Sequence, residues 1–167
     1  YIINENKKNL QLLRNDISSM CNQMNKRFDE LKINNINKQE LKFSDGKYIG
    51  QVVNGLPEGK GITYLNDGNR YEGEYKNGKA EGKGILYYND GDRYEGEWKN
   101  GNQEGKGIYY YNHGDRYEGD FRNHKREGKA IYYFSNGDRM MGDYYNGKPI
   151  GKHVKLTKNG DVKIKNY

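Results

Sequence analysis

Polar and nonpolar positions alternate with a period of two through most of the chain after Phe43. Residues 71–75 read Tyr-Glu-Gly-Glu-Tyr, which predicts a short strand with one aromatic face and one acidic face. The next dipeptide, Asn77-Gly78, favours a tight hairpin turn because both residues tolerate positive φ. Alternation resumes over residues 82–88 and ends at Asp90-Gly91, where a second turn is expected. This stretch therefore predicts one β-hairpin and the connection to another.

The hairpin pattern is repeated along the chain. Tyr71-Glu72-Gly73 recurs at residues 94–96 and at residues 117–119, a spacing of 23 residues (94 minus 71). Tyr48 and Met140 occupy the equivalent position in the outer repeats. A fixed spacing of this length is typical of repeat arrays, in which each unit packs against its neighbours. We therefore predict an all-β fold of about five consecutive hairpins in an antiparallel meander.

The first part of the chain follows a different pattern. Hydrophobic residues recur every seven positions, and no Pro or Gly interrupts residues 1–42. This spacing predicts one amphipathic, coiled-coil-like helix from about Glu5 to Ile33, on the order of 40 Å long. We assign the helix and a linker to residues 1–37, and the sheet with a degenerate C-terminal cap to residues 38–167. The residues expected to form the helix interface are Ile3, Leu10, Leu13, Ile17, Met20, Met24 and Leu31.

Two columns of glycine lie inside the predicted second strands, one containing Gly82 and the other Gly84. Glycine inside a strand costs about 0.5–1 kcal/mol relative to alanine, so its repetition needs a structural reason. We expect aromatic rings to rest on the bare backbone, an arrangement called aromatic rescue. One face of the sheet should then be a band of rings, and the other should pair glutamates with Lys and Arg across strands.

The composition indicates a folded chain with an aromatic core. Only 32% of the 167 residues are hydrophobic and 31% are charged, but 17 Tyr can supply the buried surface. The net charge of +6 is concentrated at the ends, since residues 146–167 contain six Lys against one Asp. Such a basic end can favour anionic surfaces or acidic partners, but a solvated strand face that keeps the end of the array soluble is the preferred explanation. A single cysteine, Cys21, allows no internal disulfide.

The sequence contains no pattern typical of an active site or a metal site. Gly82-Lys83-Gly84 opens a strand rather than a helix, so it does not match a phosphate-binding loop. His113, His124 and His153 occupy unrelated repeat positions without partners at metal-ligand spacing. We therefore expect no enzymatic activity, no cofactor and no metal. Nearly neutral repeats also disfavour nucleic-acid binding.

The repeated segment resembles a known family. Residues 71–93 read Tyr-Glu-Gly-Glu-Tyr-Lys-Asn-Gly, followed by Glu-Gly-Lys-Gly and an aromatic run that ends in Asn-Asp-Gly-Asp-Arg. This motif is similar to the MORN repeat (membrane occupation and recognition nexus). The match is close in the central units and weakens in residues 140–162, where Met140 and His153 replace the usual Tyr and Gly. It covers about residues 45–161.

The resemblance implies an elongated, twisted antiparallel sheet whose hairpins curl into an aromatic groove. Members of the family mostly act as scaffolds that dimerise, organise cytoskeletal structures or hold a segment of a partner. By this resemblance the groove should bind a helix or an extended peptide, either from another protein, from a second copy or from the chain's own predicted helix. The expected groove residues are Tyr71, Tyr75, Tyr88, Tyr94, Trp98, Tyr111, Tyr117, Phe121 and Phe134.

Three functions follow as alternatives. The first is a non-enzymatic scaffold in a cytoskeletal or ciliary assembly, located in the cytoplasm, the cilium or the cell cortex. The second is a peripheral membrane protein that binds anionic phospholipids through its basic end, and the third is an accessory domain of a larger enzyme. The chain begins at Tyr1 rather than Met, so organelle targeting stays open. The lysines expected to contact an anionic surface are Lys152, Lys155, Lys158, Lys163 and Lys165.

Overall fold

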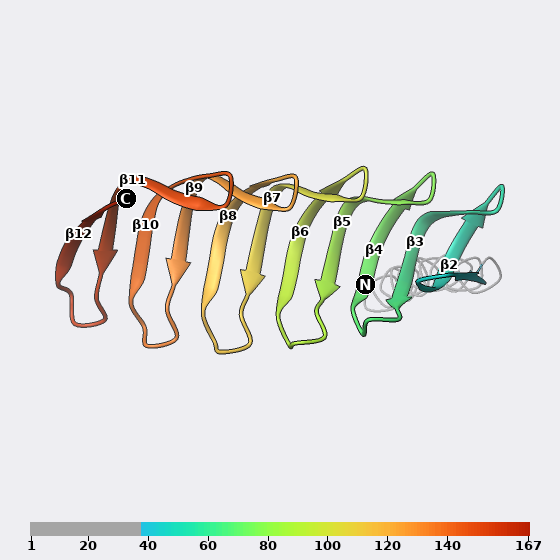
Figure 1. Ribbon diagram of the computed structural model, residues 1–167, viewed down its shortest axis with the longest axis horizontal. Coiled ribbons are helices and arrows are strands. Elements are labelled where there is room, and N and C mark those ends of the chain that lie inside the picture. The colour runs from blue at the N-terminus through green and yellow to red at the C-terminus, as the bar shows by residue number, and fades with distance from the viewer. Residues whose placement is uncertain (1–37) are drawn as a thin grey trace, which may run out of the picture. The chain divides into compact units, whose positions relative to one another are not determined.

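The computed structural model describes residues 38–167, which form one antiparallel β-sheet (Figure 1). Its twelve strands lie in chain order, so each strand pairs with its neighbours in the sequence. The helix predicted within residues 1–37 lies outside the described residues. The strands are β1 (Lys38–Phe43), β2 (Gly46–Val53), β3 (Leu56–Leu65), β4 (Arg70–Lys76), β5 (Lys79–Tyr87), β6 (Arg93–Lys99), β7 (Asn102–Tyr110), β8 (Arg116–Arg122), β9 (Lys125–Tyr133), β10 (Arg139–Tyr145), β11 (Lys148–Leu156) and β12 (Val162–Asn166).

The predicted all-β antiparallel meander is confirmed for the described residues. The repeat hairpins are β2–β3, β4–β5, β6–β7, β8–β9 and β10–β11, and β1 and β12 flank them. The hairpin turns also have the predicted geometry, since Asn77 and Gly78 have φ values of 50° and 80°. In the fourth hairpin His124 occupies the glycine position with φ at 62°.

The pairing register gives the sheet two different faces. Tyr71 lies opposite Thr63 and Leu86, on what we call the aromatic face. Glu72 lies opposite Ile62 and Ile85, on what we call the ionic face. Along the ionic face, an arginine of each central repeat lies over a tyrosine of the paired strand, and the charge-to-centroid distances are 4.2–4.4 Å. The glutamates and arginines lie opposite the aromatic face as predicted, but these tyrosines place aromatic rings on the ionic face as well.

A continuous chain of rings, which we call the aromatic spine, forms the core on the aromatic face. Neighbouring rings meet edge to face at centroid distances of 4.9–5.4 Å, a favourable geometry for aromatic pairs. The ring near the end of each repeat's first strand, such as Tyr75, packs between the tyrosine of its own repeat and that of the preceding repeat, so neighbouring repeats are joined. The spine residues of these pairs are Tyr48, Tyr75, Tyr71, Trp98, Tyr94, Phe121, Tyr117 and Tyr144.

The two glycine columns have different roles. A Cβ at Gly84 would collide with the ring of Tyr71, so this column supports the rings as predicted. The hydroxyl of Tyr71 then donates to the carbonyl oxygen of Glu74 at 3.2 Å. Gly82 instead has φ at 75° and lies at a β-bulge in the pairing of β4 with β5. The prediction that both columns serve the rings was therefore wrong for the Gly82 column, whose glycine is required by the backbone.

The last repeat continues the spine with a different residue. Met140 replaces the tyrosine of β10, and the imidazole of His153 on β11 fills the vacated space over Gly142. His153 is fully buried, and its Nε2 lies 3.0 Å from the carbonyl oxygen of Asp143. This carbonyl is equivalent to the one that accepts the tyrosine hydroxyl in the other repeats. Tyr167 then packs on His153 at 4.8 Å, so the spine reaches the end of β12.

Candidate functional site

Six of the nine predicted groove residues lie in the core rather than on an accessible surface. Their side chains belong to the aromatic spine, and no more than 8% of each residue is exposed. Neighbouring rings occupy the surface that a ligand would need. These residues therefore hold the repeats together, and a partner on this face would meet other side chains first. The six are Tyr71, Tyr75, Tyr94, Trp98, Tyr117 and Phe121.

The other three predicted residues belong to a half-buried set of rings that we call the second aromatic row. Its members lie beside the spine on the aromatic face and follow one another at centroid distances of 4.8–5.7 Å. Their planes are tilted by 38–56°, and every residue of the set is partly exposed to solvent. The row consists of Tyr88, Tyr109, Tyr111, Tyr132 and Phe134.

Sequence reasoning missed Tyr109 and Tyr132 as members of this row. The signal was available, because Tyr109 and Tyr111 are two positions apart in an extended segment and so point to the same face. The equivalent position is Thr63 and then Leu86 in the first two repeats, which hid the column. The row is thus a property of the later repeats alone.

Aspartates orient two rings of the second aromatic row, Tyr109 and Tyr132. Asp92 Oδ2 accepts the hydroxyl of Tyr109 at 2.8 Å, while its Oδ1 accepts the backbone N–H of Asn112 at 2.9 Å. Asp115 binds Tyr132 and the N–H of Ser135 in the same way, at 2.7 and 2.8 Å. Each carboxylate therefore orients a ring and caps the turn of the following repeat.

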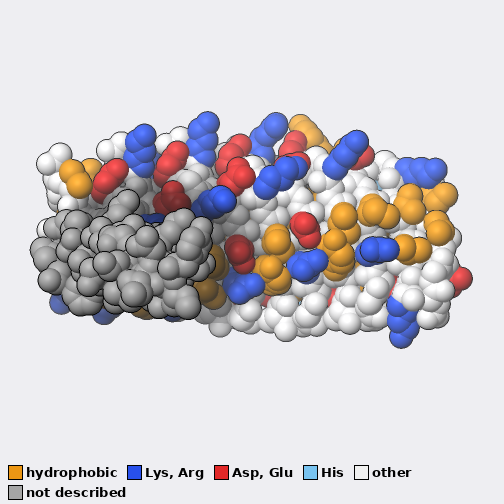
Figure 2. Space-filling view, turned by 180° about the vertical axis from the view of Figure 1, so that it is seen from behind, with side chains coloured by type: hydrophobic (Ala, Val, Ile, Leu, Met, Phe, Trp, Pro, Cys, Tyr) orange, Lys and Arg blue, Asp and Glu red, His pale blue; other side chains and the backbone are white. Residues whose placement is uncertain are grey.

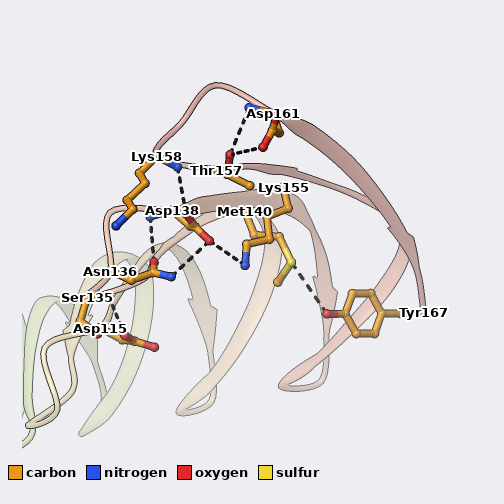
Figure 3. A network of polar contacts seen from close by, with 10 residues as sticks. All are labelled: Asp115, Ser135, Asn136, Asp138, Met140, Lys155, Thr157, Lys158, Asp161 and Tyr167. Atoms are coloured by element: carbon orange, nitrogen blue, oxygen red, sulfur yellow. Dashed lines mark hydrogen bonds and ion pairs between the residues drawn. The ribbon is translucent and has the colours of Figure 1, made fainter.

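At the end of the array the same position uses an ion pair (Figure 3). Asp138 accepts the ammonium group of Lys155 at 2.8 Å and the N–H of Lys158 at 2.9 Å. The Lys155 ammonium group also lies 4.6 Å from the centroid of Phe134, within cation–π range. These hydrogen bonds, the one from Lys155 first, hold the pKa of Asp138 below its ordinary value. The row therefore ends in a cation.

Burial raises the pKa of the row's tyrosines above the ordinary value, which is already well above neutral pH. Burial raises the pKa of Tyr109, and the hydrogen bond to Asp92 raises it further. Burial also raises the pKa of Tyr88, Tyr111 and Tyr132. Neutral rings with fixed hydroxyls are suited to stacking and apolar contact. Within residues 38–167, no three His, Cys, Asp or Glu side chains are grouped so as to hold a metal ion.

The predicted anionic-surface lysines do not share one surface. Lys155 and Lys163 lie opposite each other on the aromatic face, and the Lys165 ammonium group lies 4.3 Å from the centroid of Tyr167. Lys152 lies on the ionic face, and Lys158 lies in the turn between β11 and β12. The predicted helix-interface residues, Ile3 to Leu31, lie outside the described residues. Both sets stay predictions.

Comparison with protein families identifies the repeats. The model of the MORN repeat matches four consecutive segments, residues 48–70, 71–93, 94–116 and 117–139, which together span more than half of the chain. The chain belongs to the MORN-repeat family. The matched segments are the hairpins from β2–β3 to β8–β9, and the divergent β10–β11 hairpin lies beyond them. Membership indicates a module for protein interaction or membrane association in a family that is generally non-enzymatic.

Other comparisons add little to this assignment. No curated protein matches the chain. Among solved structures, the MORN chain is similar to the SAS-4 TCP domain of Drosophila melanogaster, determined in complex with a Proline Rich Motif of Ana2. The two share 12% sequence identity with a TM-score of 0.38, over 78% of this chain and 90% of that chain. No helix long and apolar enough to cross a membrane occurs among the described residues.

Proposed function

We propose that this MORN protein is a non-enzymatic scaffold that holds a helix or an extended peptide of another protein against its second aromatic row. The observation that carries the proposal is the half-buried state of this row. The core needs only the spine, yet the later repeats add Tyr109, Tyr111 and Tyr132 beside it. Aromatic side chains held rigidly on a strand lose little conformational entropy when a partner covers them.

The composition of the aromatic face changes along the sheet, which supports a directional mode of binding. At the position of Tyr109, successive repeats have Thr63, Leu86, Tyr109, Tyr132 and Lys155. The surface therefore changes from small and aliphatic to aromatic and then to basic. A bound segment would place apolar residues toward β3 and acidic residues toward β11.

The test compares adjacent residues that point to opposite faces. A photoreactive phenylalanine analogue replaces Tyr111 on the aromatic face or Tyr110 on the ionic face, and cross-linking is carried out in an extract of the source cell. Mass spectrometry should identify a partner cross-linked from position 111 and absent from position 110. Tyr88→Ala should reduce capture at position 111 several-fold, while Tyr87→Ala should leave it unchanged. Equal cross-linking from both faces would overturn the proposal.

The wider setting is part of the same proposal. A scaffold of this kind fits a multi-subunit assembly, for which we favour a cytoskeletal or ciliary structure within the cell. The helix predicted in residues 1–37 would supply a second contact, either to another subunit or to a second copy. Changing Leu13, Ile17 and Met20 to Asp in the full chain should weaken assembly, measured by native mass spectrometry. Unchanged assembly would show that the helix is not an anchor.

A further inference from the structure

The ionic face becomes apolar at the C-terminal end of the sheet. In the central repeats each isoleucine lies between glutamates, as Ile108 lies between Glu95 and Glu118. In the last strands this row contains only apolar side chains, and Figure 2 shows hydrophobic side chains gathered toward the right-hand end of the sheet, where β10–β12 lie. The apolar residues of this end are Ile131, Met141, Val154, Leu156, Val162 and Ile164.

Two of these residues are on β12 and are largely exposed, Val162 at 65% and Ile164 at 59%. The central strands β4, β6 and β8 carry Arg and Glu at the equivalent positions, as in Arg116 and Glu118 of β8. A solvated end strand would keep those charges. Their loss indicates that this surface is covered when the protein functions.

Within residues 38–167, the outer edge of the β12 backbone is unpaired and lies next to this apolar surface. Thr157 pairs with Asp161, and Tyr167 exchanges two hydrogen bonds with Gly151. Antiparallel pairs alternate between bonded and non-bonded positions, so Lys163 and Lys165 bond to β11 while the N–H and C=O groups of Ile164 point outward. No strand among residues 38–167 pairs with this outer edge.

The opposite side of β12 is basic and ends in an exposed ring. Lys163 and Lys165 point to the aromatic face, and neither takes part in the ion pairs found within residues 38–167. Tyr167 is 45% exposed, whereas the equivalent Tyr144 is 5% exposed. An added strand would therefore meet cations on one side and aliphatic groups on the other.

Another repeat of the same kind does not fit this edge. Within the array, Glu81 and Glu127 cap the hairpin turns of the following repeats through the N–H groups of Asn100 and Asn146, at 2.9 and 3.1 Å. The equivalent residue of the last repeat is Ile150, which cannot accept a hydrogen bond. Position 163 is a lysine, whereas the equivalent position carries the spine tyrosine in β2, β4, β6 and β8.

A second copy of this chain is also a poor fit. If β12 paired with β12 of another molecule in either antiparallel register that keeps the faces aligned, lysine would lie opposite lysine, because the residues at positions 163 and 165 share a face. Pairing with β1 of another molecule would place Glu40 and its charged neighbours against Val162 and Ile164. Leu41 packs against the core cluster, so Glu40 points to the ionic face.

We propose that the outer edge of β12 accepts an added strand from another protein, with acidic and aliphatic residues in alternation. The acidic side chains pair with Lys163 and Lys165, and the aliphatic side chains cover Val162 and Ile164. Main-chain hydrogen bonds to Ile164 and Asn166 align the added strand with β12, as in other cases of strand addition. This site is separate from the second aromatic row.

The test uses the 167-residue chain and two fluorescent peptides of about nine residues, a length typical of strands. One peptide alternates Glu with Val, and the control alternates Lys with Val. Fluorescence anisotropy should show binding of the Glu peptide at least tenfold tighter than that of the Lys peptide, weakening as salt is added. Hydrogen exchange should slow at the amides of Ile164 and Asn166 on binding.

Variants of β12 make the test specific. Ile164→Pro removes an outward N–H without touching the bonds to β11, so it should weaken binding of the Glu peptide at least tenfold, whereas Ile164→Thr should weaken it much less. Changing Lys163 and Lys165 to Glu should reverse the preference between the peptides. Loss of hydrogen-exchange protection at the Lys165 amide would show that the proline variant has lost β12. In that case the charge-reversal variant still tests the proposal.

The outcomes separate the two proposals. No binding by the unmodified chain, equal binding of both peptides, or full binding by Ile164→Pro with β12 intact would overturn strand addition. Tyr111→Ala should leave peptide binding unchanged, because Tyr111 lies outside this edge. Loss of binding in that variant would place the peptide on the aromatic row and would also overturn strand addition.

Discussion

At the scale of residues, carboxylates of one repeat organise the turns of the next. Glu58 accepts the N–H of Asn77 at 2.8 Å, and the glutamates of later repeats do the same. Asp92 and Asp115 cap the turns at the opposite edge. These hydrogen bonds join neighbouring hairpins, and each contributes modestly because the groups are exposed to solvent.

Replacing Asp115 by Asn should lower stability and reduce its dependence on acid. Burial alone would raise the pKa of Asp115. The hydrogen bonds from Tyr132, Ser135 and His113 together lower it by more, so the pKa of Asp115 is below its ordinary value. The stabilisation is therefore present above the unfolded-state pKa, near 4, and is lost as the pH falls through the lower folded-state pKa. Asp115→Asn should cost about 1 kcal/mol at neutral pH.

Urea unfolding measured by Trp98 fluorescence between neutral and acidic pH checks this prediction. The variant should show a flatter loss of stability below about pH 4 than the unmodified chain. Asn69 occupies the equivalent position in the first repeat and accepts the N–H of Asn89 at 2.9 Å, so Asn fits the site. Asn69→Asp is the reverse control and should steepen the acid dependence.

Replacing His124 by Gly should stabilise the protein. A residue with a Cβ in the left-handed region costs about 1 kcal/mol more than glycine, and His124 has φ at 62°. Chemical denaturation should show a gain of that order, and Gly101→His, the reverse change one hairpin earlier, should show a similar loss. A loss for His124→Gly would mean that the packing of the imidazole on Trp98, at 6.2 Å, outweighs the backbone term.

At the scale of elements, the β10–β11 hairpin shows that the position of a ring matters more than the strand that supplies it. Elsewhere a tyrosine of the first strand lies over glycine on the second. In this hairpin the large and small side chains exchange strands, with His153 over Gly142. The hydrogen bond to the Asp143 carbonyl is retained by the imidazole. The two sequence departures are therefore one coupled change.

This coupling can be measured with Met140 and His153. His153→Gly removes the buried ring and should cost about 2–4 kcal/mol, as for other large-to-small core changes. Met140→Tyr should also be destabilising, because His153 occupies the space for its ring. The double variant restores tyrosine over glycine and should lie within about 1 kcal/mol of the unmodified chain.

Hydrogen exchange of β10 and β11 amides, with urea unfolding, gives the coupling free energy. If the effects of His153→Gly and Met140→Tyr on the free energy of unfolding were strictly additive, the ring of His153 would not be a replacement for the missing tyrosine ring of β10. Gly151→Ala, at the bulge position of the same hairpin where φ is 65°, is the control that perturbs β11 without changing Met140 or His153.

At the scale of the whole described sheet, stability depends on one continuous row of rings rather than on a second layer. Each spine ring contacts rings of its own repeat and of a neighbour, so the contacts are local in sequence and repeat along the array. Such proteins behave as a chain of coupled units, in which stability is roughly a sum over repeats and interfaces.

Alkaline pH should therefore unfold the sheet as a unit. Burial raises the pKa of Tyr48 to about 12, and it raises the pKa of Tyr71, Tyr94 and Tyr117 as well. A raised folded-state pKa means that the stabilisation is complete below the unfolded value, near 10, and is lost as the pH rises above it. Ultraviolet absorbance of tyrosinate and circular dichroism should change together above that pH.

Tyrosine variants provide the control for the alkaline transition. Tyr94→Phe keeps the ring but removes the hydroxyl that donates to the Glu97 carbonyl at 3.0 Å, so it should make the transition less steep. Tyr145→Phe changes a residue that is 64% exposed and should leave the transition unchanged. Ionisation of the spine tyrosines without loss of strand structure would contradict the assignment of the spine as the core.

The sequence by itself determined the strands, the turns and the antiparallel order, because these depend on local alternation and on dipeptides such as Asn77-Gly78. It also predicted that rings rest on recurrent glycines, which holds for the Gly84 column beneath rings such as Tyr71. Recurrence alone did not distinguish this column from the Gly82 column, where the backbone conformation requires glycine. These properties are set within one repeat, so a periodic sequence shows them several times.

Tertiary structure alone decided which aromatic residues are core and which are surface. Tyr71 and Tyr111 look alike in the sequence, but Tyr71 is enclosed by Tyr75 and Trp98, whereas Tyr111 lies at the margin of the face. Burial depends on rings from neighbouring repeats, which alternation within one strand does not specify. For the same reason, only the register across β10, β11 and β12 showed that Ile164 lies beside Val154 and that the main-chain groups of Ile164 point away from β11.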